Sequence, residues 1–121
     1  MVIDEEDNIS LDEVVEICHK TKNENIQIRN NDPKMKTYMF LLNHNLIEDD
    51  IRKEIKNLSK ADYYKGPCED KNPNHKHPVW IFIKTINNLK CLVYIKIKII
   101  NHKRTIIVYS FHEEGMHDET E

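Results

Sequence analysis

The chain has 121 residues, of which 39% are hydrophobic and 32% are charged, with two glycines and four prolines. This length predicts a single domain, and the composition excludes collagen-like, linker-like and extensively disordered proteins. No apolar run approaches the roughly 18 residues that a membrane span needs, and the first residues are acidic where a signal peptide would be basic. We therefore expect a cytoplasmic protein without a membrane partner.

The formal net charge of −3 hides an uneven distribution of charge along the chain. Residues 1–50 hold 5 Lys/Arg and 12 Asp/Glu, whereas residues 51–112 hold 13 Lys/Arg and 4 Asp/Glu. Because salt confines charge interactions to about 10 Å, a basic patch can bind a polyanion whatever the net charge of the whole protein. Two interpretations remain open at this point, a nucleic-acid-binding face and an ordinary lysine-rich surface in contact with solvent.

The N-terminal part predicts an acidic segment, a helix and a short strand. Residues 1–9 are expected to form an acidic, mobile N-terminus. Ser10 and Glu13 have the spacing of a capping box, and the apolar residues that follow recur at helical spacing, so a helix should run to about Thr21. Alternation of apolar and polar side chains predicts a short strand at residues 26–29.

Two further helices are expected before residue 60. Asp32 and Pro33 are typical of an N-cap and a first helical residue, and this helix should end near His44. The next helix should cover residues 48–58. The apolar stripes predicted to face the core are Met35, Met39 and Leu42 in the first of these helices and Ile51, Ile55 and Leu58 in the second.

The C-terminal half predicts a turn, a long loop and three strands. A turn at residues 63–64 should lead into a polar loop at 65–78, followed by strands at 79–86, 91–100 and 105–111. Their short polar connections imply antiparallel neighbours. The expected fold class is α+β, with N-terminal helices packed on one face of a small antiparallel sheet, in one domain at residues 10–114 followed by an acidic tail at 115–121.

The strand at 91–100 contains the most informative pattern in the sequence. Its alternation places Tyr94, Lys96 and Lys98 on the face away from the helices, about 7 Å apart along the strand. That spacing matches successive phosphates of an extended nucleic-acid strand. The alternative is an ordinary solvent-exposed face, since Tyr and Lys are common there.

A histidine and a further lysine suggest a reaction. His112 lies just past the last strand, where strand pairing would bring it towards Tyr94, and Lys65 lies at the start of the long loop. Histidine is well suited to proton transfer near neutral pH. Together with lysines, this set suits metal-free RNA cleavage, in which the 2′-OH attacks the adjacent phosphorus and cations stabilise the charged intermediate.

Four short segments in order resemble a known family. They are Leu58-Ser59-Lys60-Ala61-Asp62-Tyr63-Tyr64-Lys65-Gly66-Pro67, then Val79-Trp80-Ile81-Phe82, then Val93-Tyr94-Ile95-Lys96-Ile97, then Ser110-Phe111-His112-Glu113. Over roughly residues 47–114 the chain is similar to the MqsR family of type II toxins, small toxins of the RelE-like superfamily. The resemblance implies an endoribonuclease that cleaves mRNA (an mRNA interferase), arrests growth and is neutralised by a cognate antitoxin.

The resemblance also implies roles for individual residues. The catalytic lysine and tyrosine of the family fall on Lys65 and Tyr94. The chain has Ile81 where the best-known members have glutamine, and His112 where they have lysine, a change that keeps a group able to act as acid or base. His112 is then the third expected catalytic residue. The expected substrate-binding residues are Tyr64, Lys84, Lys96 and Lys98. Lys84 would supply a cation near the missing glutamine and would share a face with Trp80, which we assign to the core.

Other interpretations stay open. Cys68, Asp70, His75 and His77 could form a zinc site on the long loop, although the spacing matches no standard structural motif and no metal is required by the chemistry above. A second class of function is a non-catalytic module that binds RNA or protein through the basic sheet. A third possibility is an RNase that cuts only on the ribosome.

Overall fold

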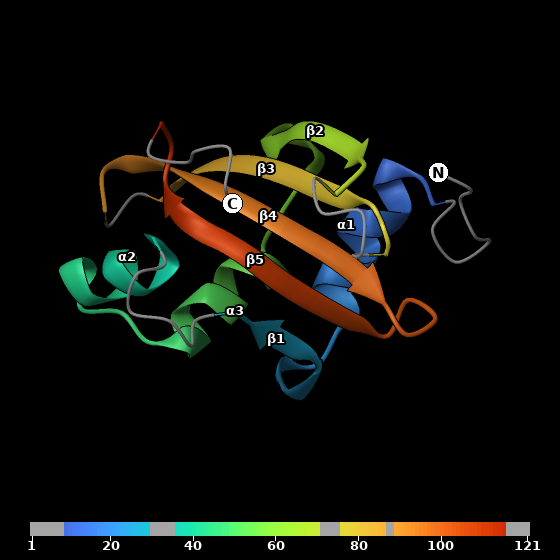
Figure 1. Cartoon of the computed structure of the whole chain (residues 1–121), viewed down its shortest axis with the longest axis horizontal. Coiled ribbons are helices and arrows are strands. Elements are labelled where there is room, and N and C mark those ends of the chain that lie inside the picture. Colours follow the sequence, from blue (N-terminus) through green and yellow to red (C-terminus); the bar gives the residue numbers. More distant parts are fainter. Residues whose placement is uncertain (1–8, 30–35, 71–75, 87–88, 116–121) are drawn as a thin grey trace.

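The computed structural model describes residues 9–29, 36–70, 76–86 and 89–115. The expected N-terminal segment at 1–8 and the tail at 116–121 therefore lie outside the described residues. Figure 1 shows the strands side by side, with the helices behind and beside them. The elements are α1 (Leu11–Lys20), η2 (Asn23–Asn25), β1 (Ile26–Ile28), α2 (Lys36–His44), α3 (Glu48–Lys56), η3 (Lys60–Asp62), β2 (Tyr63–Cys68), β3 (Val79–Ile86), β4 (Cys91–Ile100) and β5 (Thr105–Glu113).

The described strands form one mixed sheet in the order β1-β5-β4-β3-β2. β2, β3, β4 and β5 pair antiparallel with their neighbours, whereas β1 pairs parallel with β5, with Ile26 opposite Ile106. The α+β class is confirmed. The expectation of a purely antiparallel sheet is wrong at one edge, because β1 and β5 are not joined by a short turn: α2, α3 and the strands β2, β3 and β4 lie between them in the chain.

The helices cover one face of the sheet, as expected. Alternate residues of the strands face the helices, and these side chains form the core together with apolar residues of α1, α2 and α3. Fully burying one large aliphatic side chain contributes roughly 1.5–3 kcal/mol, so this layer is the main stabilising feature of the fold. The core includes Val14, Cys18, Phe40, Ile51, Ile55, Leu58, Phe82, Val93, Ile95, Ile97, Ile99, Ile106, Val108 and Phe111.

α1 and α3 follow their predicted patterns. Ser10 caps α1, since its Oγ accepts a hydrogen bond of 3.2 Å from the backbone N–H of Glu13. The carboxylate of Glu13 does not complete the capping box but pairs with Lys103 at 2.7 Å, which ties α1 to the turn between β4 and β5. In α3 the predicted stripe of Ile51, Ile55 and, just past the helix end, Leu58 is fully buried.

The predicted core face of α2 is wrong. Met39 and Leu42 are exposed, and the buried residues of this helix are Thr37, Phe40 and Leu41. Residues 38–42 are apolar without interruption, so their sequence contains two apolar stripes, and the tertiary fold buries only one. The start expected at Asp32 and Pro33, and Met35 with it, lies outside the described residues.

α2 also protects part of a sheet edge. β1 pairs with β5 only from Ile106 to Val108, so the outer edge of β5 has no strand partner beyond that point among the described residues. Thr37 lies against this edge, and its Oγ1 accepts a hydrogen bond of 3.0 Å from the backbone N–H of Phe111. Phe40 packs edge to face on Phe111. The helix thereby provides a hydrogen-bond acceptor for the backbone N–H of Phe111, which has no strand partner on this edge of the described sheet.

The loop expected at residues 65–78 is partly a strand. β2 runs from Tyr63 to Cys68 and pairs with β3, with irregularities in register on both sides of Lys65. Gly66 has φ +134°, and a Cβ atom there would lie 2.9 Å from the carbonyl oxygen of Val79. Glycine is required because the strands approach too closely for a side chain. Gly66 and Pro67, which are typical loop residues, are here part of an irregular edge strand.

The last three strands agree closely with the sequence pattern. β3 and β4 have the predicted bounds, and β5 is two residues longer than expected and contains His112. β4 and β5 change register between Lys96 and Ile97, where Tyr109 of β5 is the extra residue. Bulges of this kind bend a strand and redirect side chains.

Candidate active site on the sheet face opposite the helices

Tyr94 and His112 lie directly opposite each other on adjacent strands. The register pairs Tyr94 of β4 with His112 of β5, and their rings stack with centroids 5.3 Å apart and an interplanar angle of 20°. Both point away from the helices, because the residues between them in sequence, such as Ile95 and Phe111, face the core. The expected proximity of His112 to Tyr94 is thus confirmed. We refer to this side of the sheet as the candidate face.

One imidazole nitrogen of His112 has a defined partner. Nδ1 lies 3.0 Å from the backbone carbonyl oxygen of Glu113. A carbonyl oxygen only accepts hydrogen bonds, so Nδ1 carries the hydrogen and donates it. In a neutral imidazole the lone pair then lies on Nε2.

Lys65 and Lys96 lie in the next row of the same face. Lys65 of β2 pairs with Ile81 of β3, Ile81 pairs with Lys96 of β4, and Lys96 pairs with Ser110 of β5. Strands are spaced about 4.8 Å apart, so the backbones of Lys65 and Lys96 are roughly 10 Å apart. The side chain of Lys65 is exposed and that of Lys96 is partly exposed. The fold therefore places Lys96 next to the Tyr94–His112 pair, and Lys65 two strands away from Lys96 in the same row.

The candidate face is less open than the sequence suggested. The side chain of Tyr94 is 7% exposed and that of His112 is 1% exposed. A purely solvent-facing sheet would leave both rings accessible. Neither ring is accessible from solvent to more than a small extent in this structure.

Lys98 does not have the position expected of a substrate-binding residue. It is on the candidate face but only 2% exposed, and its Nζ pairs with Asp70 at 2.6 Å and donates a hydrogen bond of 2.9 Å to the carbonyl oxygen of Lys76. It also lies over the ring of Tyr109. Asp70 neutralises the charge of Lys98, and the two contacts hold Asp70 and Lys76 against the sheet. The expectation that Lys98 is a free cation that binds phosphate is therefore wrong.

Lys84 lies on the other face. It does share a face with Trp80, as predicted, but that face meets the helices, and Nζ pairs with Glu54 of α3 at 2.9 Å. Lys84 therefore supplies no cation beside Ile81, which points to the candidate face and is buried. Trp80 is in the core, as assigned from the sequence.

Tyr64 is exposed beside Lys65. Its side chain is 62% exposed, and it lies within the register irregularity between Tyr63 and Lys65. An exposed aromatic ring next to a lysine is the arrangement that stacks a nucleobase while the cation contacts a phosphate. Tyr64 and Lys65 are the accessible part of the predicted site.

Ser110 is a residue of this face that the sequence interpretation did not single out. It lies opposite Lys96, it is 1% exposed, and its Oγ has no hydrogen-bond partner. A buried hydroxyl without a partner is destabilising by about 1–3 kcal/mol and often marks a functional position. A serine two residues before His112 on the same strand was visible in the sequence, but its burial was not.

The zinc interpretation finds little support in the described residues. Asp70 pairs with Lys98, Cys68 lies in β2, and His75 is outside the described residues. Within the described ranges no three His, Cys, Asp or Glu side chains come together to hold a metal ion. Burial raises the pKa of the Cys18 thiol to about 12 and, to a lesser extent, the pKa of Cys91, so neither is a reactive thiolate at neutral pH.

Comparisons with protein-family models, curated proteins and solved structures found no match. Among the helices of the described residues, none is long and apolar enough to cross a membrane. On the candidate face, a tyrosine, a histidine and two lysines lie in two neighbouring rows.

Proposed function

We propose that this protein is an endoribonuclease that cleaves RNA by attack of the 2′-OH on the adjacent phosphorus, without a metal ion. The observation that supports this most is the stacked pair of Tyr94 and His112, with Lys65 and Lys96 in the neighbouring row. These side chains provide a proton acceptor, a proton donor and two cations, which are the groups that the reaction needs.

The proposed reaction assigns one role to each group. Nε2 of His112 takes the proton of the 2′-OH as the 2′-oxygen bonds to phosphorus. The bond from phosphorus to the 5′-oxygen breaks, and the hydroxyl of Tyr94 gives that oxygen a proton. Lys65 and Lys96 stabilise the negative charge that develops on the phosphate oxygens. The products are a 2′,3′-cyclic phosphate and a 5′-hydroxyl.

The biological part of the proposal comes from the resemblance to the MqsR family of RelE-like toxins. We propose that the protein is the toxin of a type II toxin–antitoxin system, acting in the cytoplasm on mRNA, free or on the ribosome, and neutralised by a cognate antitoxin. In its support, Lys65 and Tyr94, the positions matching the family's catalytic lysine and tyrosine, lie on one face of one sheet. Expression of the wild type, but not of His112→Ala, should then arrest growth.

The direct test is cleavage of an end-labelled RNA by purified protein in excess EDTA, with His112→Ala purified in parallel. The proposal predicts cleavage by the wild type alone, with 2′,3′-cyclic phosphate at the new ends. Equal cleavage by both proteins would show that His112 has no part in the reaction or that a contaminating nuclease is present. If neither cleaves RNA, adding translating ribosomes tests the ribosome-dependent form of the proposal.

A second candidate function is a binding module without catalysis. It is favoured by the burial of His112 and Tyr94, which are 1% and 7% exposed, because a group out of reach of the substrate transfers no proton. The two functions differ in the response to His112→Ala. In an enzyme the variant loses turnover while RNA affinity stays nearly intact, whereas in a binding module affinity is the only property that can change.

A further inference from the structure

α2 has an apolar side that this chain does not cover in the described structure. Phe40 and Leu41 pack into the core, whereas Met39 and Leu42, on the other side of the helix, are 44% and 65% exposed. An apolar stripe on a helix is normally covered. Among the described residues, nothing covers this outer stripe of α2.

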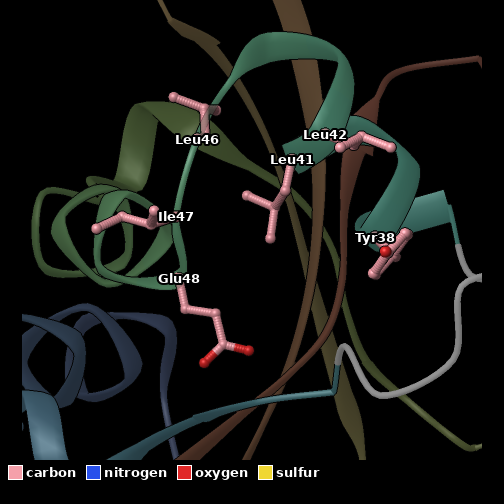
Figure 2. A pocket seen from close by; sticks show the side chains of 6 residues that line it. All are labelled: Tyr38, Leu41, Leu42, Leu46, Ile47 and Glu48. Atoms are coloured by element: carbon pink, nitrogen blue, oxygen red, sulfur yellow. The ribbon is translucent and has the colours of Figure 1, made fainter.

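This stripe borders a hollow between α2 and α3. The hollow has a volume of about 350 Å³, and Figure 2 shows Leu41 and Glu48 extending toward the space between the two helices. Ile47, at the start of α3, is 65% exposed. Of the five exposed large hydrophobic residues in the described chain, Leu42 and Ile47 line this hollow, and Met39 lies on α2 outside its lining. The lining consists of Tyr38, Leu41, Leu42, Leu46, Ile47 and Glu48.

One residue of the lining, Glu48, is acidic, and among the described residues the lining contains no Lys or Arg. Arg52, one turn further along α3, pairs with Asp49 at 2.7 Å and more loosely with Glu48 at 3.6 Å. The side chain of Glu48 remains 43% exposed, so a cation from outside can still approach it. An apolar hollow with an accessible carboxylate is complementary to an apolar segment that carries a positive charge.

The backbone around the hollow favours a helix as the bound segment. The amide of Leu46 bonds to the carbonyl of Leu41, and that of Asp50 bonds to the carbonyl of Ile47. Among the described residues the lining comes from two helices and their link, and none of it is a strand edge to which an extended peptide could add. Recognition must then use side chains inserted between α2 and α3, as when an amphipathic helix packs into a groove.

We infer that the hollow between α2 and α3 is a docking site for an amphipathic helix of a partner protein, with apolar residues at helical spacing inserted beside Leu41 and Leu42 and a Lys or Arg paired with Glu48. The site is formed by the helices and lies away from the candidate face. It therefore does not depend on the proposed ribonuclease activity and would stand if that activity failed.

The test uses two synthetic helical peptides of about 18 residues with the same Leu face, long enough to hold helical structure, one with Lys and one with Glu on the polar face. Each is titrated into the 15N-labelled full-length chain and followed by NMR. The variants are Leu42→Asp, Glu48→Lys and, as a matched control, Leu92→Asp, which replaces an exposed leucine of β4 that is 49% exposed. Leu42 is exposed, so its replacement spares the core, and melting temperatures check that each variant folds.

We expect the Lys peptide to shift amides of residues 38–48 saturably and the Glu peptide to bind more weakly. Leu42→Asp should lower the affinity at least ~10-fold although it adds a negative charge, because apolar insertion is lost. Leu92→Asp should bind as the wild type does, and Glu48→Lys should reverse the preference between the peptides. Shifts confined to other regions, equal affinity of Leu42→Asp, or an unchanged preference in Glu48→Lys would each overturn the inference.

Discussion

Tyr94 and His112 form a stacked pair across the ladder between β4 and β5, with ring centroids 5.3 Å apart. The two residues are 18 positions apart in the sequence, and their contact is set by the antiparallel register of the two strands. The same register places Lys96 one row away, opposite Ser110. The predictions below test whether this face is a reaction site and which of its polar residues have structural roles instead.

Lys65 is expected to contribute to cleavage without contributing to stability. Its side chain is exposed, so Lys65→Gln should leave the melting temperature unchanged. Loss of one cation that stabilises the developing charge should lower kcat/KM by roughly 100-fold or more. The control is Lys53→Gln, an exposed lysine of α3, which should stay near wild-type activity. Equal activity of the two variants would remove Lys65 from the mechanism.

Lys98 and Asp70 are expected to matter for stability. Their ion pair of 2.6 Å is largely buried, and removing one partner leaves an uncompensated charge. Lys98→Met alone should lower the free energy of unfolding by about 3–5 kcal/mol, and combining it with Asp70→Asn should restore part of the loss. Urea denaturation measures both. If Lys98→Met has wild-type stability, the role assigned to this pair is wrong.

Ser110→Ala should make the protein more stable. The buried hydroxyl has no partner, so replacing it with a methyl group removes the penalty of an unsatisfied polar group, about 1 kcal/mol. Ser59→Ala is a useful contrast, because the Ser59 hydroxyl bonds to Asp62 at 3.2 Å and its loss should be slightly destabilising. A higher melting temperature for Ser110→Ala and a lower one for Ser59→Ala would support this interpretation, and a lower melting temperature for Ser110→Ala would contradict it.

Cys18 gives a prediction for alkaline pH. Burial raises its pKa from 9.0 to about 12 in the folded protein, so between these values the unfolded thiol is ionised while the folded one keeps its proton. The folded state then binds more protons, and the free energy of unfolding falls as pH rises through this range. Cys18→Ala lacks this contribution. The stability of the wild type should therefore fall more steeply than that of the variant, and parallel curves from pH 9 to 12 would refute the prediction.

The sequence predicted best what depends on local periodicity. The alternation in residues 79–86 and 91–100 predicted both strands with their observed bounds, and the stripe of Ile51, Ile55 and Leu58 identified the buried side of α3. In each case one face of the element is apolar and the other is not, so the pattern determines which face is buried. The pairing of Tyr94 with His112 followed because the short turn between β4 and β5 allowed only antiparallel neighbours.

The sequence was less informative where the pattern was ambiguous or the contact was distant. The apolar run at 38–42 did not reveal which side of α2 is buried, and the register irregularities around Lys65 obscured β2. The parallel pairing of Ile26 with Ile106 and the ion pair of Lys98 with Asp70 join segments far apart in the chain. Such contacts depend on the whole fold, which explains why Lys84 and Lys98 were expected to bind substrate.

The most direct test of the central claim is whether RNA reaches the Tyr94–His112 pair. A 2′-O-methyl RNA has no 2′-OH and is not cleaved by the proposed reaction, so it can be titrated into labelled protein while the ring resonances of His112 are followed by NMR. The account predicts a saturable shift of His112 together with Tyr94 and the amide of Lys65. Saturable binding that leaves His112 and Tyr94 unshifted would contradict it and would place the RNA, if it binds, on another surface.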